Sequence, residues 1–188
     1  MGVGKSSLLS KYVRGIFPTS PLPTIAIEFA TKIIQLKEGG YVKAQIWDTA
    51  GQEKYKSLTK SYYTNAKGAL LIFDISNKES FLSIDKWISD LQSITGKNII
   101  IILIGNKSDL EIERKVSYEE GIIKAKKHNL FYLETSALLN TNIEKAFNIL
   151  TEMIYQNYLV DTNKEIPVRS FIISEEITNP NEKSTCLC

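Results

Sequence analysis

Two continuous apolar runs constrain the fold of this chain more than any other feature. They are "GALLIFDI" (68–75) and "NIIIILIGN" (98–106), and neither alternates between apolar and polar residues. Such runs are typical of strands buried on both faces of a sheet. Segments with helical periodicity lie between and after them, and "FYLETS" (131–136) supplies another short strand. The helical segments are 80–94, 117–127 and 142–158. Strands alternating with helices predict the α/β class, with a mostly parallel sheet covered by helices on both faces.

The first quarter of the chain predicts a helix, a loop and a hairpin. Apolar spacing in "KSSLLSKYVRG" predicts a helix that ends at Gly15. The following "FPTSPLPT" holds three of the five prolines, and proline keeps such a stretch out of a helix. Two β-patterned runs, 25–36 and 41–47, flank the "EGG" of 38–40. We expect them to pair as a hairpin.

Composition limits the chain to one ordinary domain and a tail. The chain has 188 residues, of which 43% are hydrophobic, and a net charge of +2 from 23 basic and 21 acidic residues. This balance argues against a nucleic-acid partner. No signal peptide or membrane-spanning run is apparent, which favours a cytoplasmic protein. We predict a globular domain over 1–160 and a flexible tail over 161–188, because periodicity fails in the last segment.

The opening "GVGKSS" matches the second half of a phosphate-binding loop. Glycines allow backbone N–H groups to surround phosphate oxygens, Lys5 can reach the terminal phosphates, and the Ser6 hydroxyl can bind Mg²⁺. The full pattern requires a glycine five positions before Gly4, which falls before Met1. Taken alone, the string is equally compatible with a glycine-rich helix start.

The string "AQIWDTAGQE" strengthens the phosphate-site interpretation. It is a hydrophobic strand that ends in an acid and continues into a turn of small residues. Asp48 is placed to hold the water shell of Mg²⁺, and the Gly51 N–H to contact a γ-phosphate. Gln52 follows that glycine and is expected to orient an attacking water. Each residue alone is common in surface turns, but the whole string is not.

Two further strings predict the base that is bound. "GNKSD" follows the strand at 98–106, and the carboxylate of Asp109 can accept two parallel hydrogen bonds from guanine N1–H and its amino group, which adenine does not offer. Asn106 is expected to tie neighbouring loops together, and the Lys107 stem to lie over the base. "ETSA" follows the next strand, and the backbone N–H of Ala137 is placed to meet guanine O6.

In these motifs the chain resembles the Ras superfamily of small GTPases, and within it the Rab family. Rab-like segments stand at "IAIEF" (25–29), "KAQIWDTAGQE" (43–53), "YYTNA" (62–66) and "LIFDI" (71–75), and "EFATKIIQL" is most similar to the recycling-endosome branch. The resemblance implies the P-loop NTPase-type fold of a small-GTPase G domain, GTP and GDP as ligands with Mg²⁺, and slow GTP hydrolysis that controls vesicle and membrane traffic.

The motifs and the resemblance together define the predicted site. Gln52 is the predicted catalytic residue. Thr24 is implied as a further Mg²⁺ ligand beside Ser6 and Asp48, and Phe17 as an aromatic packed on the guanine. The predicted nucleotide-binding residues are Gly2, Val3, Gly4, Lys5, Ser6, Ser7, Phe17, Thr24, Gly51, Asn106, Lys107, Asp109, Ser136 and Ala137. The residues implied to report the nucleotide state to effectors are Ile25, Phe29, Trp47 and Tyr62.

The ending "CLC" resembles the C-x-C signal of Rabs, in which both thiols carry geranylgeranyl groups. Cys186 and Cys188 are therefore the expected lipidation sites. Two lipids are needed because a single chain gives only marginal membrane binding. The implied location is the cytoplasm, with reversible attachment to the cytosolic face of endosomal or other vesicular membranes. The implied partners are effector proteins, an exchange factor, a GTPase-activating protein, a prenylation escort and a GDP-dissociation inhibitor.

The sequence departs from the Rab pattern at its front and in one loop. We expect the N-terminal strand and the front of the phosphate loop to be missing from it. Ala26 stands where the family has a glycine, and Pro18, Pro21 and Pro23 stiffen the adjoining loop. The front end alone supports an alternative: a truncated isoform or pseudo-GTPase that acts only as a binding protein.

Overall fold

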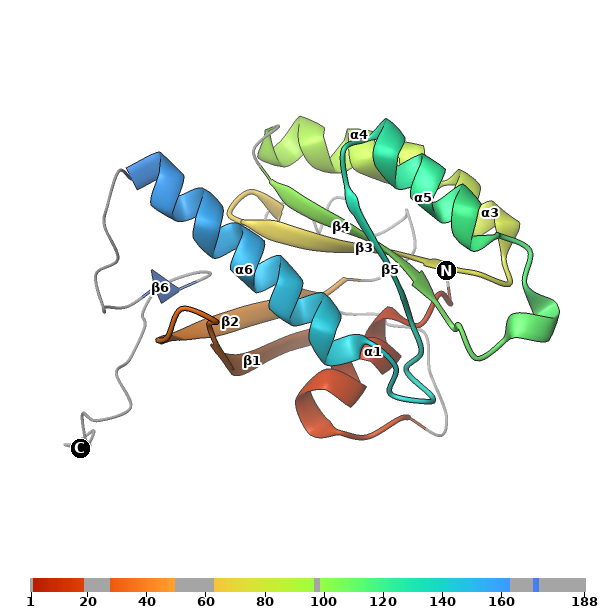
Figure 1. Ribbon diagram of the computed structural model, residues 1–188, viewed down its shortest axis with the longest axis horizontal. Helices are drawn as coiled ribbons and strands as arrows, with labels where there is room; N and C mark the ends of the chain where they lie inside the picture. Colours follow the sequence, from red (N-terminus) through yellow and green to blue (C-terminus); the bar gives the residue numbers. More distant parts are fainter. Residues whose placement is uncertain (1, 19–27, 50–62, 97–98, 163–170, 173–188) are drawn as a thin grey trace.

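The protein is described by a computed structural model, which defines residues 2–18, 28–49, 63–96, 99–162 and 171–172. Within these residues the strands form two three-stranded sheets, with helices packed on both faces (Figure 1). The α/β class predicted from the apolar runs is confirmed.

The first sheet contains the predicted hairpin. Strands β1 (Glu28–Gln35) and β2 (Tyr41–Asp48) are antiparallel, with Glu28 opposite Asp48 and Gln35 opposite Tyr41. Gly39 and Gly40 connect them with φ of 90° and 88°, values that L side chains rarely adopt. The third strand, β6 (Phe171–Ile172), lies parallel to β2 on the side away from β1.

The second sheet is entirely parallel. It consists of β3 (Gly68–Asp74), β4 (Ile100–Asn106) and β5 (Phe131–Thr135), in that order. The register places Asp74 opposite Asn106, and Asn106 opposite Thr135. Three polar side chains therefore end neighbouring strands at one edge of the sheet, where α/β folds build ligand sites.

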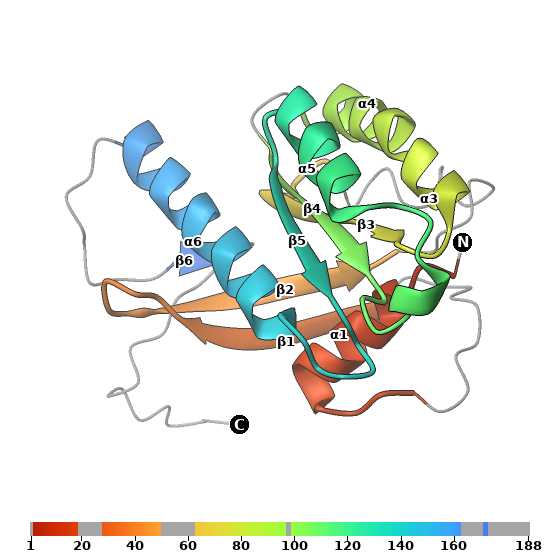
Figure 2. The same cartoon turned by 45° about the vertical axis from the view of Figure 1, so that its right-hand side comes forward.

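Helices cover both faces of the strands, as Figure 2 shows. The helices α1 (Lys5–Arg14) and α6 (Ile143–Thr162) share one apolar cluster with the strands, which includes Leu8, Ile104 and Phe147. On the other side lie α3 (Lys78–Leu82), α4 (Ile84–Thr95) and α5 (Tyr118–Lys127). Their cluster is centred on Phe73 and Leu103, both fully buried. A short 3-10 helix, η2 (Glu111–Glu113), precedes α5.

The helix ends follow local sequence. Gly15 ends α1 in the left-handed conformation, with φ of 70°, as its position predicts. Ser117 and Glu120 form a reciprocal capping box at the start of α5. None of the described helices is long and apolar enough to cross a membrane.

Two helical segments differ from prediction. The predicted helix 80–94 is two helices that meet at Ser83, whose hydroxyl donates to the Glu79 carbonyl at 2.9 Å. Such bonding by serine competes with the regular helix pattern. Helix α6 continues to Thr162, just beyond the predicted domain boundary, and β6 lies within the predicted tail.

Candidate nucleotide site

The phosphate-loop residues lead directly into helix α1. Gly4 stands just before the helix with φ of 89°, and Lys5 is its first residue. This places a glycine turn at the positive end of a helix dipole, an arrangement suited to phosphate. Burial lowers the pKa of Lys5, and the charge of Asp48 partly opposes that effect. Of the other predicted loop residues, Gly2 also has positive φ, and Val3 and Ser7 are buried.

Ser6 and Asp48 bring two oxygen ligands together. The Ser6 hydroxyl donates a hydrogen bond to Asp48 Oδ2, although the residues are 42 positions apart in the chain. Asp48 is only 4% exposed. A hydroxyl beside a carboxylate fits Mg²⁺, which takes one or two protein oxygens and completes its shell with water and phosphate. Among the described residues no three His, Cys, Asp or Glu side chains gather into a metal site.

Asn106 joins the segment around Val3 to the end of strand β5. Its Nδ2 donates to the Val3 carbonyl at 2.9 Å, and its Oδ1 accepts from the Thr135 hydroxyl at 3.0 Å. Asn106 is 1% exposed and Thr135 is fully buried. Hydrogen bonds of this kind hold three separate segments in one arrangement, because breaking any of them leaves a buried polar group unsatisfied.

Asp109 and Ser136 meet across the loops that follow β4 and β5. The Ser136 hydroxyl donates to Asp109 Oδ1 at 2.5 Å and accepts from the Leu139 backbone N–H at 3.0 Å. Ser108 N–H donates to the Thr135 carbonyl at 3.0 Å, which ties the two loops together again. Ala137 is buried beside them. The carboxylate predicted to recognise guanine is thereby oriented by its neighbour.

Lys107 is fixed by an acid that the sequence analysis did not assign. Its Nζ lies 2.6 Å from Asp74 Oδ2, and its backbone has a φ of 65°, which is uncommon outside glycine. Asp74 is 5% exposed. Its only signal in the sequence was its position at the end of an apolar run, in the segment "LIFDI". The ion pair restrains the Lys107 side chain beside the end of β3.

A second network of ion pairs and hydrogen bonds links the segments next to the base loops. Arg114 donates through two nitrogens to Glu134 at 2.8 Å and also bonds Glu111. These hydrogen bonds, to Glu134 first, raise the pKa of Arg114 above its ordinary value. The Tyr132 hydroxyl donates to Glu134 at 2.8 Å, and burial raises its pKa. The network connects η2 to β5, the elements that flank Asp109 and Ser136.

The remaining predicted site residues divide into two groups. Phe29 and Trp47 lie on paired strands with ring centroids 4.6 Å apart, and are 49% and 42% exposed. Phe17 is partly buried against the cluster of α1 and α6. The others lie outside the described residues: Thr24, Ile25, Gly51, Gln52, Tyr62, Cys186 and Cys188.

Comparisons with known proteins place the chain in one family. Residues 1–156 match the family described as the Ras family. The chain is 44% identical over 191 residues to Ras-related protein Rab2BV of Beta vulgaris, covering 98% of this chain and 89% of the relative. It is 43% identical to Ras-related protein rab-11.1 of Caenorhabditis elegans, covering 99% and 90%. It is 48% identical to Ras-related protein Rab-11A of Dictyostelium discoideum, covering 82% and 72%.

Proposed function

We propose a function for this chain from the family to which it belongs, the Ras family, and within it the recycling-endosome branch of the Rab small GTPases. As a Rab, it is a guanine-nucleotide-binding GTPase of vesicle traffic, and the comparisons do not favour the alternative of a binding protein without activity. The proposal assigns the individual roles of its residues. Gly4 and Lys5 hold phosphates, Asp109 recognises guanine, and Gln52 orients the attacking water.

The observation that carries this assignment is the meeting of four distant segments. Asn106 bonds both Val3 and Thr135, and Asp109 bonds Ser136. The phosphate loop and both base loops are thereby held at the carboxyl edge of the parallel sheet, where nucleotides bind in α/β folds. The Ser6–Asp48 contact adds the hairpin to the same assembly.

We propose Ser6, Asp48 and Thr24 as the residues that hold Mg²⁺ with the nucleotide. The ion would neutralise phosphate charge and so stabilise both the bound nucleotide and the charge that develops during hydrolysis. Ser6 and Asp48 stand in direct contact, which supports their assignment to one ion. Their carboxylate and hydroxyl match the preference of Mg²⁺ for oxygen ligands.

Removing Mg²⁺ should weaken nucleotide binding at least about ten-fold, because phosphate charge beside Asp48 then lacks compensation. Titrating a fluorescent GTP analogue with Mg²⁺ or with excess chelator measures the change. Ser6→Ala removes one proposed ligand, so its affinity should depend less on Mg²⁺. An affinity of the unaltered protein that is the same in both buffers would contradict the proposed metal ligands.

Substituting Gln52→Leu should lower single-turnover GTP hydrolysis at least about ten-fold and leave GTP affinity nearly unchanged. The reason is that Gln52 is assigned to orient water and not to hold nucleotide. Gln156→Leu, the same change on an exposed face of α6, is the matched control and should leave hydrolysis unchanged. If Gln52→Leu hydrolyses GTP at the normal rate, Gln52 has no part in the reaction.

As a Rab, the chain works with regulators and effectors. We propose an exchange factor, a GTPase-activating protein, a prenylation escort and a GDP-dissociation inhibitor as its regulators. The exposed pair Phe29 and Trp47, together with Ile25 and Tyr62, is proposed to contact effectors when GTP is bound. Geranylgeranyl groups on Cys186 and Cys188 would attach the protein to the cytosolic face of endosomal or other vesicular membranes.

A further inference from the structure

The guanidinium of Arg114 uses all of its hydrogen-bond donors. Its Nε bonds Glu111, its Nη2 bonds Glu111 and Glu134, and its Nη1 bonds Glu134 and the Val116 carbonyl, at distances between 2.7 and 3.0 Å. A guanidinium carries five N–H groups in one plane, so this set of partners fixes both its position and its orientation. Arg114 therefore connects η2, the segment before α5 and strand β5 through a single rigid group.

Glu134 is held from two further sides. The Tyr132 hydroxyl donates to its Oε1 at 2.8 Å, and the Asn142 side chain donates to its backbone carbonyl at 2.9 Å. The side chains of Arg114 and Glu134 are 17% and 13% exposed, and Tyr132 is buried. An ion pair shielded to this degree is costly to break, because removing one partner leaves the other charged without compensation.

Tyr132 reaches Glu134 because two glycines lie beside its ring. A Cβ at Gly105 in β4 would lie 2.7 Å from the Tyr132 hydroxyl oxygen, and a Cβ at Gly121 in α5 would overlap the ring carbon that carries this hydroxyl. The ring of Phe73 lies parallel to that of Tyr132, with centroids 6.2 Å apart. The phenol is therefore confined between β4 and α5, in the position from which its hydroxyl meets Glu134.

On the side of β5, this network lies next to residues that hold the base loops. Glu134 directly precedes Thr135 and Ser136. Thr135 bonds Asn106, and Ser136 bonds Asp109. Glu134 and Thr135 are paired in register with β4, so a displacement of Glu134 is expected to disturb both contacts.

On the side of β4, a series of tight turns joins Asp109 to Arg114. Backbone hydrogen bonds close three overlapping turns there, over 107–110, 110–113 and 111–114. These turns leave the segment little freedom to extend, so a shift of Arg114 is transmitted toward Asp109. The two base loops are thus linked twice: at the site through Asp109 and Ser136, and behind it through Arg114 and Glu134.

We propose that Arg114, Glu134 and Tyr132 are positioning residues of the guanine site, which lengthen the lifetime of the bound nucleotide by holding Asp109 and Ser136 in place. This inference rests on the proposed guanine-nucleotide site. The three side chains act through the loops and need not contact the nucleotide. When the connection behind the site is broken, the loops separate more often and the base is released faster.

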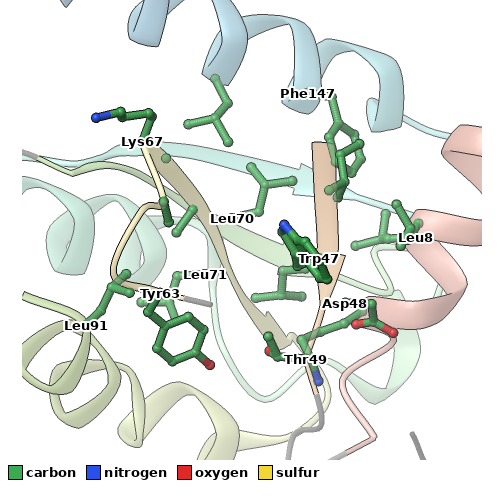
Figure 3. A pocket seen from close by; sticks show the side chains of 18 of the residues that line it. Leu8, Trp47, Asp48, Thr49, Tyr63, Lys67, Leu70, Leu71, Leu91 and Phe147 are labelled. Carbon is green, nitrogen blue, oxygen red and sulfur yellow. The ribbon is translucent and has the colours of Figure 1, made fainter. Parts of the chain in front are cut away.

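The network is separate from the pocket beside β3 that Figure 3 shows. That pocket is lined by residues such as Leu8, Leu70 and Phe147, and none of the three positioning residues lines it. Strand β5, which carries Tyr132 and Glu134, lies on the other side of β4 from β3. A substitution in the network is therefore expected to act on the base loops and not through this pocket.

Release of a fluorescent GDP analogue from the full chain tests this role. The protein is loaded with the analogue in buffer with Mg²⁺, excess unlabelled GDP is added, and the loss of fluorescence gives the dissociation rate. Arg114→Lys keeps the charge but cannot make the bidentate contact, and Glu134→Gln removes the charge of the acceptor. Both should release the analogue at least about ten times faster, and Tyr132→Phe, which removes only a hydroxyl, about two to five times faster.

Asp85→Asn is the matched control. Asp85 on α4 also contacts several cations, namely Lys124, Lys127 and His128 at the end of α5, but it is not part of the base loops. Its substitution should lower the melting temperature and leave the release rate unchanged. Combining Arg114→Lys with Glu134→Gln tests whether the two residues act together. The double variant should release the analogue at nearly the rate of the faster single variant, and rates that multiply would contradict a joint role.

Hydrogen exchange of the nucleotide-free chain gives a second readout. Amides of 107–110 and 136–141 should exchange faster in Arg114→Lys and Glu134→Gln, and at the normal rate in Asp85→Asn. Unchanged exchange in these loops, or release rates equal to that of the unaltered protein, would overturn the positioning role and leave the guanine site in place. An unaltered protein that does not retain the GDP analogue would contradict the guanine site itself, and the positioning role with it.

Discussion

Asp109→Asn should lower the affinity for GTP by about two to four orders of magnitude and turn the preference of the site toward xanthine nucleotides. The carboxylate is proposed to accept hydrogen bonds from guanine, whereas an amide would present an N–H where the guanine amino group stands. Xanthine carries a carbonyl at that position and can accept from the amide. Competition titrations with GTP, XTP and ATP on both proteins measure the change.

The expected size of this effect depends on how firmly Asp109 is held. Its Oδ1 accepts a hydrogen bond from Ser136, which is fully buried and is itself fixed by the Leu139 N–H. The side chain therefore has little freedom to turn away from a mismatched base. Glu119→Gln, the same loss of charge at an exposed position in the first turn of α5, is the control. If it weakened GTP binding as much as Asp109→Asn, the effect would reflect overall charge and not base recognition.

Gly4→Ala should both destabilise the fold and weaken nucleotide binding at least about ten-fold. A Cβ at this position would lie 2.5 Å from Asn106 Nδ2, well inside van der Waals contact. Moving the Asn106 side chain aside would break buried hydrogen bonds, because it bonds Val3 and Thr135 and is 1% exposed. The substitution therefore disturbs the hydrogen bonds that join the phosphate loop to β5. Thermal melts and titration with a GTP analogue measure both effects.

Gly15→Ala is the matched control for Gly4→Ala. Gly15 also has positive φ, 70°, but a Cβ there would meet nothing within 4 Å. Both variants carry the backbone strain of a left-handed alanine, about 1 to 2 kcal/mol. Only Gly4→Ala adds the contact with Asn106. The account would be contradicted if both variants lost the same melting temperature and neither changed nucleotide affinity. The position and hydrogen bonds of Asn106 would then not require a glycine at position 4.

Local sequence predicted the elements because their causes are local. The continuous apolar runs predicted two parallel strands, and Gly15 predicted the end of α1, since each pattern reflects the burial or backbone geometry of its own residues. Strand β4 is buried as expected, whereas residues 68–72 of β3 are only partly buried. The break at Ser83 was missed because apolar periodicity continues across it, from Phe81 to Ile84. The competing side-chain bond from Ser83 to Glu79 leaves no trace in that periodicity.

The residues of the candidate site could be proposed from the sequence where a short motif contains them. The strings around Lys5, Asp48 and Asp109 each specify a residue type that phosphate, metal or guanine requires. The pairings that support them were not predictable, because Lys107 and Asp74, or Arg114 and Glu134, are far apart in the chain. Sequence periodicity describes the residues of one element, whereas such ion pairs depend on which loops the folded sheet brings together. The pairing of β6 with β2 could not be predicted from the sequence for the same reason.

The most direct test of the account is the base preference of the unaltered protein. A fluorescent GTP analogue is bound to the full chain in buffer with Mg²⁺, and unlabelled GTP or ATP is added as competitor. The geometry around Asp109 and Ser136 predicts that GTP displaces the analogue and that ATP fails to do so at a hundred-fold higher concentration. Displacement by GTP and ATP at equal concentrations would contradict the assignment of this edge of the sheet as a guanine-nucleotide site.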